Sequence, residues 1–346
     1  MKARTDRRTT RTTAVVVGPS GHGVVRHALA VAEATGVPVV RRPRPPDPAR
    51  FAGVAELAGS NVHWHFTDRL FGATAMDAAT RFTNLVRRLP ARSVVTLHDV
   101  PDPDGTERAG RRIAAFERVV AAADAVIVSS EQEADRLRRA GIDADVAVIP
   151  LPVIEAGGPS PPVHRTRAGT VAVLGFVYPG KGHADVIDAV GSILRADVVR
   201  LRIEALGTAS TGHAELVAML HGRAARLRCP FAVTGHLSDA ALTAALCQVD
   251  VPVVPARTVS ASASMATWIG AGRRPLVARN GYTEEIARFG DVVTLYDPSR
   301  PGALADAITW AATDPTRTRR SGPVPDQLTI TAVAQAHRRL FDRLAS

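Results

Sequence analysis

VVVGPSGHG (15–23) and VAVLGFVYPGKG (171–182) are the two stretches of sequence that decide the fold. Each is a short apolar strand that runs into a glycine-containing turn at the start of a helical stretch. Beyond both of them, short apolar strands alternate with Ala-rich amphipathic segments, which is the pattern of parallel sheets covered by helices. The sequence therefore predicts an α/β protein made of two doubly wound, Rossmann-like domains.

Composition marks the expected domain boundaries. Residues 155–169 are rich in Pro and Gly and have no apolar period, as expected of a linker. We expect a basic, disordered tail at 1–13, an N-terminal domain at 14–154, a C-terminal domain at 170–325, and a final helix at 326–346 with the option of crossing back to the N-terminal domain.

Charge and hydropathy exclude several classes of protein. The 43 basic residues exceed the 33 acidic ones and give a net charge of +10. This excess is scattered over predicted helices and lacks the interleaved aromatic residues of a nucleic-acid site. No apolar run approaches the roughly 20 residues of a membrane-spanning helix, and the N-terminus lacks the apolar segment of a secretory signal. We therefore expect a cytoplasmic protein whose basic tail makes at most weak contact with an anionic membrane. The oligomeric state is left open.

Lys181 is the first candidate for a binding residue. Lys2 and Lys181 are the only lysines in the chain, and Lys181 stands between two glycines at the start of a predicted helix. A helix N-terminus and a compact ammonium both favour phosphate, so this pattern indicates an anion site. The turn around Gly21 indicates either close approach of a ligand to the backbone or a simple tight turn.

A serine-rich turn follows the apolar strand that ends at Val254. It carries Ser260, Ser262 and Ser264 at alternate positions, with Arg257 close by. Small hydroxyl groups at such a place cap the next helix or bind an anion or a sugar, and one serine is enough for a cap. Three serines therefore favour a ligand site. The charges of the Arg273–Arg274 pair are explained by the C-terminus of the helix that they follow.

Polar residues also end two strands of the N-terminal half. They are His63, His65, Asp68, Arg69, His98 and Asp99. A histidine at the carboxyl end of a strand is placed to bind a hydroxyl group or to move a proton, and we prefer His98 over His65 for this role. His63 is interpreted as packing. No HExxH or CxxC spacing accompanies these histidines, so no metal site is predicted, and GxSxG and P-loop motifs are absent from the sequence.

Several motifs occur in the order of one known family. They are VVTLHDV (94–100), DAVIVSS (124–130), VIPLPV (148–153), GFVYPGKG (175–182) and a PLV…EEI stretch (275–286). Over residues 14–313 these motifs together resemble the retaining GT-B glycosyltransferases of family 4. That resemblance implies two Rossmann-like domains that face a central cleft and clasp a nucleotide-sugar donor.

The resemblance also implies roles for individual residues. Lys181 would sit on the donor diphosphate, His98 near the transferred sugar, and Gly21 between donor and acceptor. The further donor-side residues are Gly182, Arg257, Ser260, Ser262, Ser264, Thr267 and Glu285, and the acceptor-side residues are His65, Asp68, Arg69 and Asp99.

The sequence departs from the family pattern at two places. By the resemblance, the family's paired glutamates would fall near Val259 and Thr267, neither of which is acidic, and the arginine that precedes its lysine falls at Phe176. The hydroxyl groups of the serine-rich turn and of Thr267 are the candidate replacements for the glutamates, and Arg257 is the candidate replacement for the arginine.

The resemblance implies a transferase that needs no metal or cofactor. It would move a sugar from a nucleoside diphosphate to a hydroxyl acceptor with retention of configuration. Because the glutamates are missing, two alternatives stay open: a GT-B-type nucleotide-sugar epimerase and a non-catalytic protein that binds sugar nucleotides.

Overall fold

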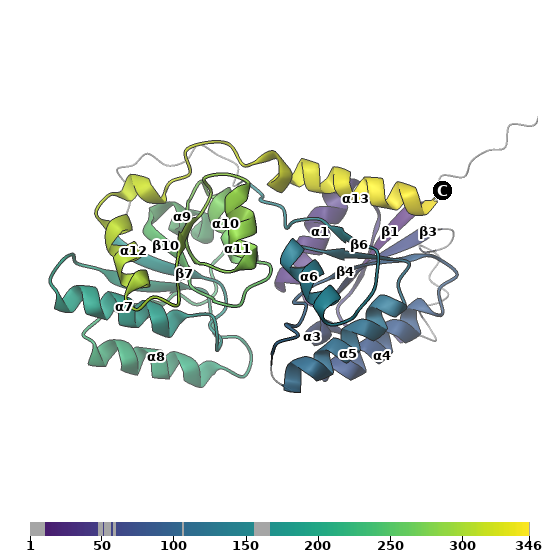
Figure 1. The fold of residues 1–346 in the computed structure, drawn as a ribbon, viewed down its shortest axis with the longest axis horizontal. Coiled ribbons are helices and arrows are strands. Elements are labelled where there is room, and N and C mark those ends of the chain that lie inside the picture. Colours follow the sequence, from purple (N-terminus) through teal and green to yellow (C-terminus); the bar gives the residue numbers. More distant parts are fainter. Residues whose placement is uncertain are drawn as a thin grey trace, which may run out of the picture. The chain divides into compact units, whose positions relative to one another are not determined.

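The computed structural model describes residues 11–47, 51, 57, 60–105, 107–155 and 167–345. These residues form two compact units, each built on its own six-stranded sheet. The first unit comprises the described residues up to Leu151 together with the C-terminal helix α13 (Ile330–Ala345), and the second comprises those from Pro152 to Thr329 (Figure 1). Most of the predicted tail (1–10) and most of the predicted linker (156–166) lie outside the described residues.

The first unit is a parallel sheet in the order β2-β1-β3-β4-β5-β6. Its strands are β1 (Arg11–Val17), β2 (Val39–Arg42), β3 (Ser60–Phe66), β4 (Ser93–Leu97), β5 (Ala125–Val128) and β6 (Val146–Val148). Its helices, besides α13, are α1 (Gly23–Thr35), α3 (Asp68–Phe71), α4 (Ala75–Val86), α5 (Glu107–Ala121) and α6 (Glu131–Arg139). Strands β3 and β4 are buried along their whole length, as expected of central parallel strands.

The C-terminal helix belongs to this first unit. Val333, Leu340 and Phe341 repeat at helical spacing and pack in one apolar cluster with residues of α1, β4 and β5. Arg338 fixes the contact, because its guanidinium donates hydrogen bonds to the last carbonyl groups of α1, at 2.5 Å and 3.1 Å.

The second unit repeats the plan with the strand order β12-β11-β10-β7-β8-β9, again all parallel. Its strands are β7 (Arg167–Leu174), β8 (Arg202–Leu206), β9 (Phe231–Val233), β10 (Val249–Val254), β11 (Leu276–Ala278) and β12 (Thr294–Tyr296). Its helices are α7 (His183–Arg195), α8 (Ala214–Arg226), α9 (Asp239–Gln248), α10 (Ala263–Gly270), α11 (Gly281–Arg288) and α12 (Ala303–Ala312), followed by the short 3₁₀ turns η3 (Pro315–Thr318) and η4 (Asp326–Leu328).

The predicted fold class is confirmed, but two strands begin earlier than the sequence pattern indicated. β1 begins at Arg11, within the predicted tail, because buried Thr12 and Thr13 pair with β3. β-branched residues such as threonine favour strands even where no apolar run announces one. β7 begins at Arg167, within the predicted linker. None of the described helices is long and apolar enough to span a membrane.

The strand order reverses once in each sheet, between β1 and β3 and between β7 and β10. In doubly wound sheets, ligands bind beyond the carboxyl ends of the strands at such a reversal. The loops at these positions are those after β1 and β3 in the first unit and those after β7 and β10 in the second. The latter two contain Lys181 and the serine-rich turn.

Candidate functional site

Lys181 lies at the end of a tight turn between β7 and α7. Gly175 and Gly182 have φ values of 109° and 90°, which side chains other than glycine rarely adopt. A Cβ atom added at Gly182 would lie 2.8 Å from the ring of Pro255, which follows β10. Glycine at position 182 therefore allows the turn that carries Lys181 to pack closely against the loop after β10.

The Lys181 ammonium is buried without a negative partner. The side chain is 8% exposed, and its Nζ donates a hydrogen bond to Ser264 Oγ at 3.0 Å. No carboxylate among the described residues forms an ion pair with it. Burial lowers the pKa of Lys181 to about 8, so the group stays protonated at neutral pH. A buried cation without a counter-charge is costly, and a bound anion would relieve that cost.

The serine-rich turn divides its work between capping and Lys181. Ser262 is the N-cap of α10, and its hydroxyl accepts a hydrogen bond from the Met265 amide at 3.2 Å. The Ser262 and Ser264 hydroxyl oxygens are 3.2 Å apart, and the Ser262 amide donates to the hydroxyl of Tyr282. Ser264 therefore connects the cap of α10 to the Lys181 ammonium.

The other predicted donor-side residues make contacts of different kinds. Arg257 is 59% exposed and has its Nε 3.7 Å from an Asp185 oxygen, so its charge is partly compensated. The Thr267 hydroxyl donates to the Ala263 carbonyl of its own helix at 2.8 Å. Ser260 is buried in the turn and Glu285 is buried on α11.

Sequence reasoning missed His183, the first residue of α7. It is 3% exposed, and both ring nitrogens are buried without a hydrogen-bond partner. Burial, and then the neighbouring Lys181 charge, lower the pKa of His183 to about 4, so the ring is neutral. Its position directly after the glycine-flanked lysine was the available signal.

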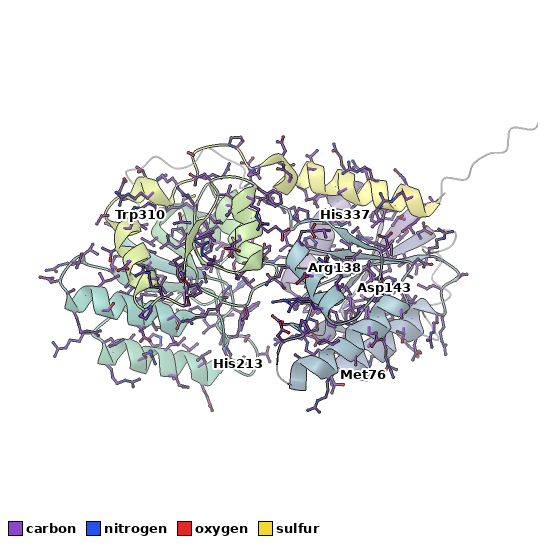
Figure 2. All side chains as sticks on the ribbon, viewed as in Figure 1. Met76, Arg138, Asp143, His213, Trp310 and His337 are labelled. Atoms are coloured by element: carbon purple, nitrogen blue, oxygen red, sulfur yellow. The ribbon has the colours of Figure 1, made fainter. Side chains whose placement is uncertain are left out.

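In the first unit, histidines from four elements form one buried cluster. They are His27 on α1, His63 and His65 on β3, His98 after β4, and His337 on α13. Figure 2 labels His337 on α13. Burial lowers the pKa of each of them below the ordinary 6.5, in the case of His98 to about 4. The cluster is therefore uncharged at neutral pH.

Hydrogen bonds orient most of these rings. His65 Nδ1 lies 3.1 Å from His98 Nε2, and the two rings are stacked. His63 Nε2 lies 2.8 Å from the Thr96 hydroxyl, in agreement with a packing role, and His337 Nδ1 donates to the Val333 carbonyl. Two predicted residues, His65 and His98, are thus in direct contact, whereas His27 and His337 were missed because they come from distant helices.

His27, His65 and His98 also offer ligand nitrogens that lie within 4.8 Å of one another. A metal-bound histidine usually donates its second ring N–H to a carboxylate or a carbonyl. His65 lacks such a contact, because its Nε2 is buried without a partner. The arrangement fits a hydrogen-bonded pair better than a metal centre, and the absence of a metal site stays a prediction.

The acidic residues of this edge hold the loop after β4. Asp68 accepts a hydrogen bond from Arg112 Nε at 2.8 Å, and Arg112 Nη2 donates to the Asp99 carbonyl at 2.9 Å. Asp99 has a φ of 57°, in the left-handed region that Asp tolerates, and accepts from the Thr67 hydroxyl. Asp68 therefore has a structural partner, Arg112, that sequence reasoning missed, while Arg69 is exposed.

Gly21 lies in the exposed loop after β1. A Cβ atom added there would meet no atom within 4 Å, so packing does not require glycine at this position. Close approach of a ligand at Gly21 stays a prediction. The loop ends at His22, whose Nδ1 accepts from the Val24 amide and caps α1.

Comparisons with known proteins agree with the fold of the two units. The family model described as Glycosyltransferase Family 4 matches residues 12–156, which is most of the first unit. No curated protein sequence matches the chain.

Solved structures match both units. They include HepE of Anabaena in complex with UDP-glucose (17% identity, 96% of this chain and 98% of that chain covered, TM-score 0.68). A sucrose-phosphate synthase of Thermosynechococcus elongatus matches at 16% identity (97% and 96%, 0.67), and a glycosyltransferase of Rickettsia africae at 11% (97% and 99%, 0.65). The predicted GT-B fold is confirmed, and the resemblance to family 4 is confirmed over the matched residues.

Proposed function

We propose that this GT-B protein is a glycosyltransferase that moves a sugar from a nucleoside diphosphate to a hydroxyl acceptor with retention of configuration. The observation that carries the proposal is the Lys181 ammonium, which is buried beside Ser264 at the strand-order reversal without a carboxylate among the described residues. A diphosphate supplies the missing negative charge.

The chemistry asks the second unit to stabilise the departing diphosphate. Negative charge develops on the leaving phosphate oxygens, and a preorganised cation strengthens its interaction with them in the transition state. The N-cap of α7, Gly182, makes no side-chain capping bond, so the first amide groups of this helix are available for phosphate oxygens. Lys181 and these amides come from one turn and act together.

The first unit supplies neutral hydrogen-bonding groups for the sugar and its acceptor. His98 is uncharged, and its Nε2 is engaged by His65, so the His98 Nδ1 is the nitrogen left for a hydroxyl group. Gly21 leaves open backbone in the loop after β1. The UDP-glucose bound to HepE supports a uridine nucleotide sugar as the first donor to test.

A second candidate is a protein that binds a nucleotide sugar without turnover. The specific observation in its favour is that Val259 and Thr267 stand near the places where the family resemblance implies paired glutamates, and that the Thr267 hydroxyl is already bonded within its helix. Neutral groups hold sugar hydroxyls more weakly than charged ones.

One assay distinguishes the candidates. The protein is incubated with UDP-glucose and other nucleotide sugars, with and without simple glycoside acceptors. Free nucleoside diphosphate with a new glycoside identifies a transferase, an altered donor sugar identifies an epimerase, and calorimetric binding without either product identifies a binding protein. The configuration of the product, read by proton NMR, tests retention.

Lys181→Met is the variant that tests the site. Loss of a hydrogen bond to a charged group weakens donor binding by about 1.5–3 kcal/mol, which is roughly ten- to a hundredfold. Arg223→Met is the control, because Arg223 lies on α8 and pairs with Asp188 at the surface. Equal donor affinity of Lys181→Met and wild type would refute the assignment.

A further inference from the structure

Two arginines face each other at the opposite, amino edge of the second sheet. Arg273 precedes β11 and Arg319 follows η3, and the two residues form an isolated antiparallel bridge. Hydrogen bonds on both sides hold the bridge, from the Arg274 amide to the Thr318 carbonyl at 2.8 Å and from the Arg320 amide to the Gly272 carbonyl at 3.0 Å. Directly opposite residues of an antiparallel pair extend their side chains to the same face, so the bridge brings two like charges together.

Both guanidinium groups carry buried N–H groups without a partner. Arg273 is 2% exposed, and its Nη2 donates to the Asp250 carbonyl at 3.0 Å and to the Thr318 hydroxyl at 2.9 Å. Its Nε and Nη1, and the Nε and Nη2 of Arg319, have no hydrogen-bond partner. Unpartnered buried donors are rare in proteins and point to a bound water or ion.

Arginine-rich composition does not account for this pair. Neighbouring arginines of the same two segments each have a carboxylate: Arg274 with Asp291 at 2.6 Å, Arg317 with Asp314 at 3.5 Å, and Arg320 with Glu155 at 2.9 Å. Among the described residues, neither Arg273 nor Arg319 has one. The linker residues 156–166, which lie outside them, contain no Asp or Glu.

The local charges leave one positive charge over. Asp250 is the nearby acid; its Oδ2 accepts from the Gly169 amide at 2.5 Å, and its Oδ1 is buried without a partner. Burial and Arg319 lower the pKa of Arg273 to about 10, which keeps Arg273 protonated at neutral pH. Burial raises the pKa of the neighbouring Cys247 thiol, which therefore remains neutral. Two guanidinium groups against one carboxylate amount to a single uncompensated cation.

We propose that the Arg273–Arg319 pair binds a small monovalent inorganic anion of the size of chloride. Unpartnered N–H groups of both guanidinium groups are its donors, among them the Nε–Nη2 pair of Arg319, whose N–H bonds point to the same side, and its single charge balances the surplus cation. The anion neutralises the repulsion across the bridge and so ties the start of β11 to the segment after α12. Because Gly169 lies near the start of β7 and Lys181 follows its end, the anion site lies at the other end of the strand from the proposed donor site.

Anion-dependent unfolding of the full chain tests the proposal. Thermal midpoints are measured at constant ionic strength while gluconate is replaced by chloride or bromide. A ligand that binds only the folded state raises the midpoint with the logarithm of its concentration once the site is saturated. Arg319→Gln removes two of the donors and the surplus charge, and it is expected to abolish this rise. Arg317→Gln, which changes an arginine with a carboxylate partner, is expected to keep it.

The position of the anion is tested in crystals of the wild-type protein grown in bromide. An anomalous peak between the two guanidinium groups supports the proposal, even where Arg319→Gln fails to fold. Water at that place overturns the proposal. A chloride response that is equal in wild type, Arg317→Gln and Arg319→Gln indicates an adventitious ion only and also overturns it. Neither outcome bears on nucleotide-sugar binding, which the Lys181 variant tests separately.

Discussion

The carboxyl edge of the first sheet gathers uncharged imidazoles, whereas the carboxyl edge of the second holds a buried ammonium. Burial acts on both groups in the same sense: it lowers the pKa of His98 from 6.5 to about 4 and that of Lys181 from 10.5 to about 8. Because the starting values differ, His98 is neutral at pH 7 and Lys181 is protonated. One physical cause therefore produces two chemically different sites on two sheets of the same plan.

The difference assigns complementary tasks to the two units under the proposed function. A neutral imidazole can exchange hydrogen bonds with sugar and acceptor hydroxyls without attracting phosphate. A cation without a counter-charge favours a phosphate oxygen over a neutral hydroxyl group. The comparison would be contradicted if the first unit were not destabilised by acid, or if donor binding to the second unit did not weaken at alkaline pH.

The largest expected effect is acid destabilisation of the first unit. A histidine whose folded pKa is depressed takes up a proton in the unfolded chain first, so stability present above pH 6.5 is lost as the pH falls towards the folded pKa. For His98 alone, the shift to about 4 corresponds to about 3 kcal/mol of unfolding free energy. Urea unfolding between pH 7 and pH 4 measures the loss.

A matched pair of variants assigns this loss to the buried cluster. His337→Leu removes one buried imidazole that bonds only within its own helix, so stability should fall less steeply with decreasing pH. His221→Gln changes an exposed histidine on α8 and should leave the slope unchanged. Identical slopes in all three proteins would contradict the role given to the cluster.

The second expected effect is the loss of donor binding at alkaline pH. Since the pKa of Lys181 is lowered to about 8, the free protein loses the ammonium above that pH. Each further pH unit should weaken donor binding about tenfold, until the neutral form binds as well as it can. Calorimetric titration with UDP-glucose from pH 7 to pH 9.5 measures the profile. In Lys181→Arg the decline should disappear, because arginine stays protonated throughout.

The third expected effect concerns His65, which contacts His98 through Nδ1. Loss of this hydrogen bond should raise the activation free energy by about 1 kcal/mol. This corresponds to a roughly fivefold lower kcat, with little change in donor KM. His65→Asn keeps a polar atom at about the distance of Nδ1 along the side chain and should retain more activity than His65→Gln. Nitrogen NMR of the His98 ring reports its tautomer and pKa, which a purely structural defect would leave in place. Equal kcat in the two variants would remove His65 from this role.

The fold could be predicted from the local sequence pattern, because buried parallel strands are short apolar runs. In addition, the first strand of each sheet is followed by a glycine-containing turn. Arg167 and Thr12 show the limit: strand ends are set by pairing with a neighbour, here β10 and β3, and not by the apolar run alone. The association of α13 with the first unit depended on contacts that only the folded chain supplies.

The candidate site was predictable where a residue was rare and not where a partner was distant. Lys181 stood out as a lysine among arginines, but nothing near it in the sequence indicated that Ser264 would be its partner, since 83 residues separate them. Arg273 was interpreted as a charge at a helix end, and this interpretation is wrong. Its guanidinium is buried and bonded to the Asp250 carbonyl, because the following segment brings Thr318 and Arg319 against it.

The smallest expected effect separates the two serines beside Lys181. Ser262 caps α10, so Ser262→Ala should lower the unfolding free energy by about 1 kcal/mol. Ser264 does not cap the helix; its hydroxyl accepts a hydrogen bond from the Lys181 ammonium. Ser264→Ala should therefore change donor affinity instead, by roughly fivefold or less. Urea unfolding and calorimetric donor titration are measured on both variants. A larger change of donor affinity in Ser262→Ala than in Ser264→Ala would mean that the conformation of the turn positions the Lys181 ammonium, and not the Ser264 hydroxyl group that it contacts.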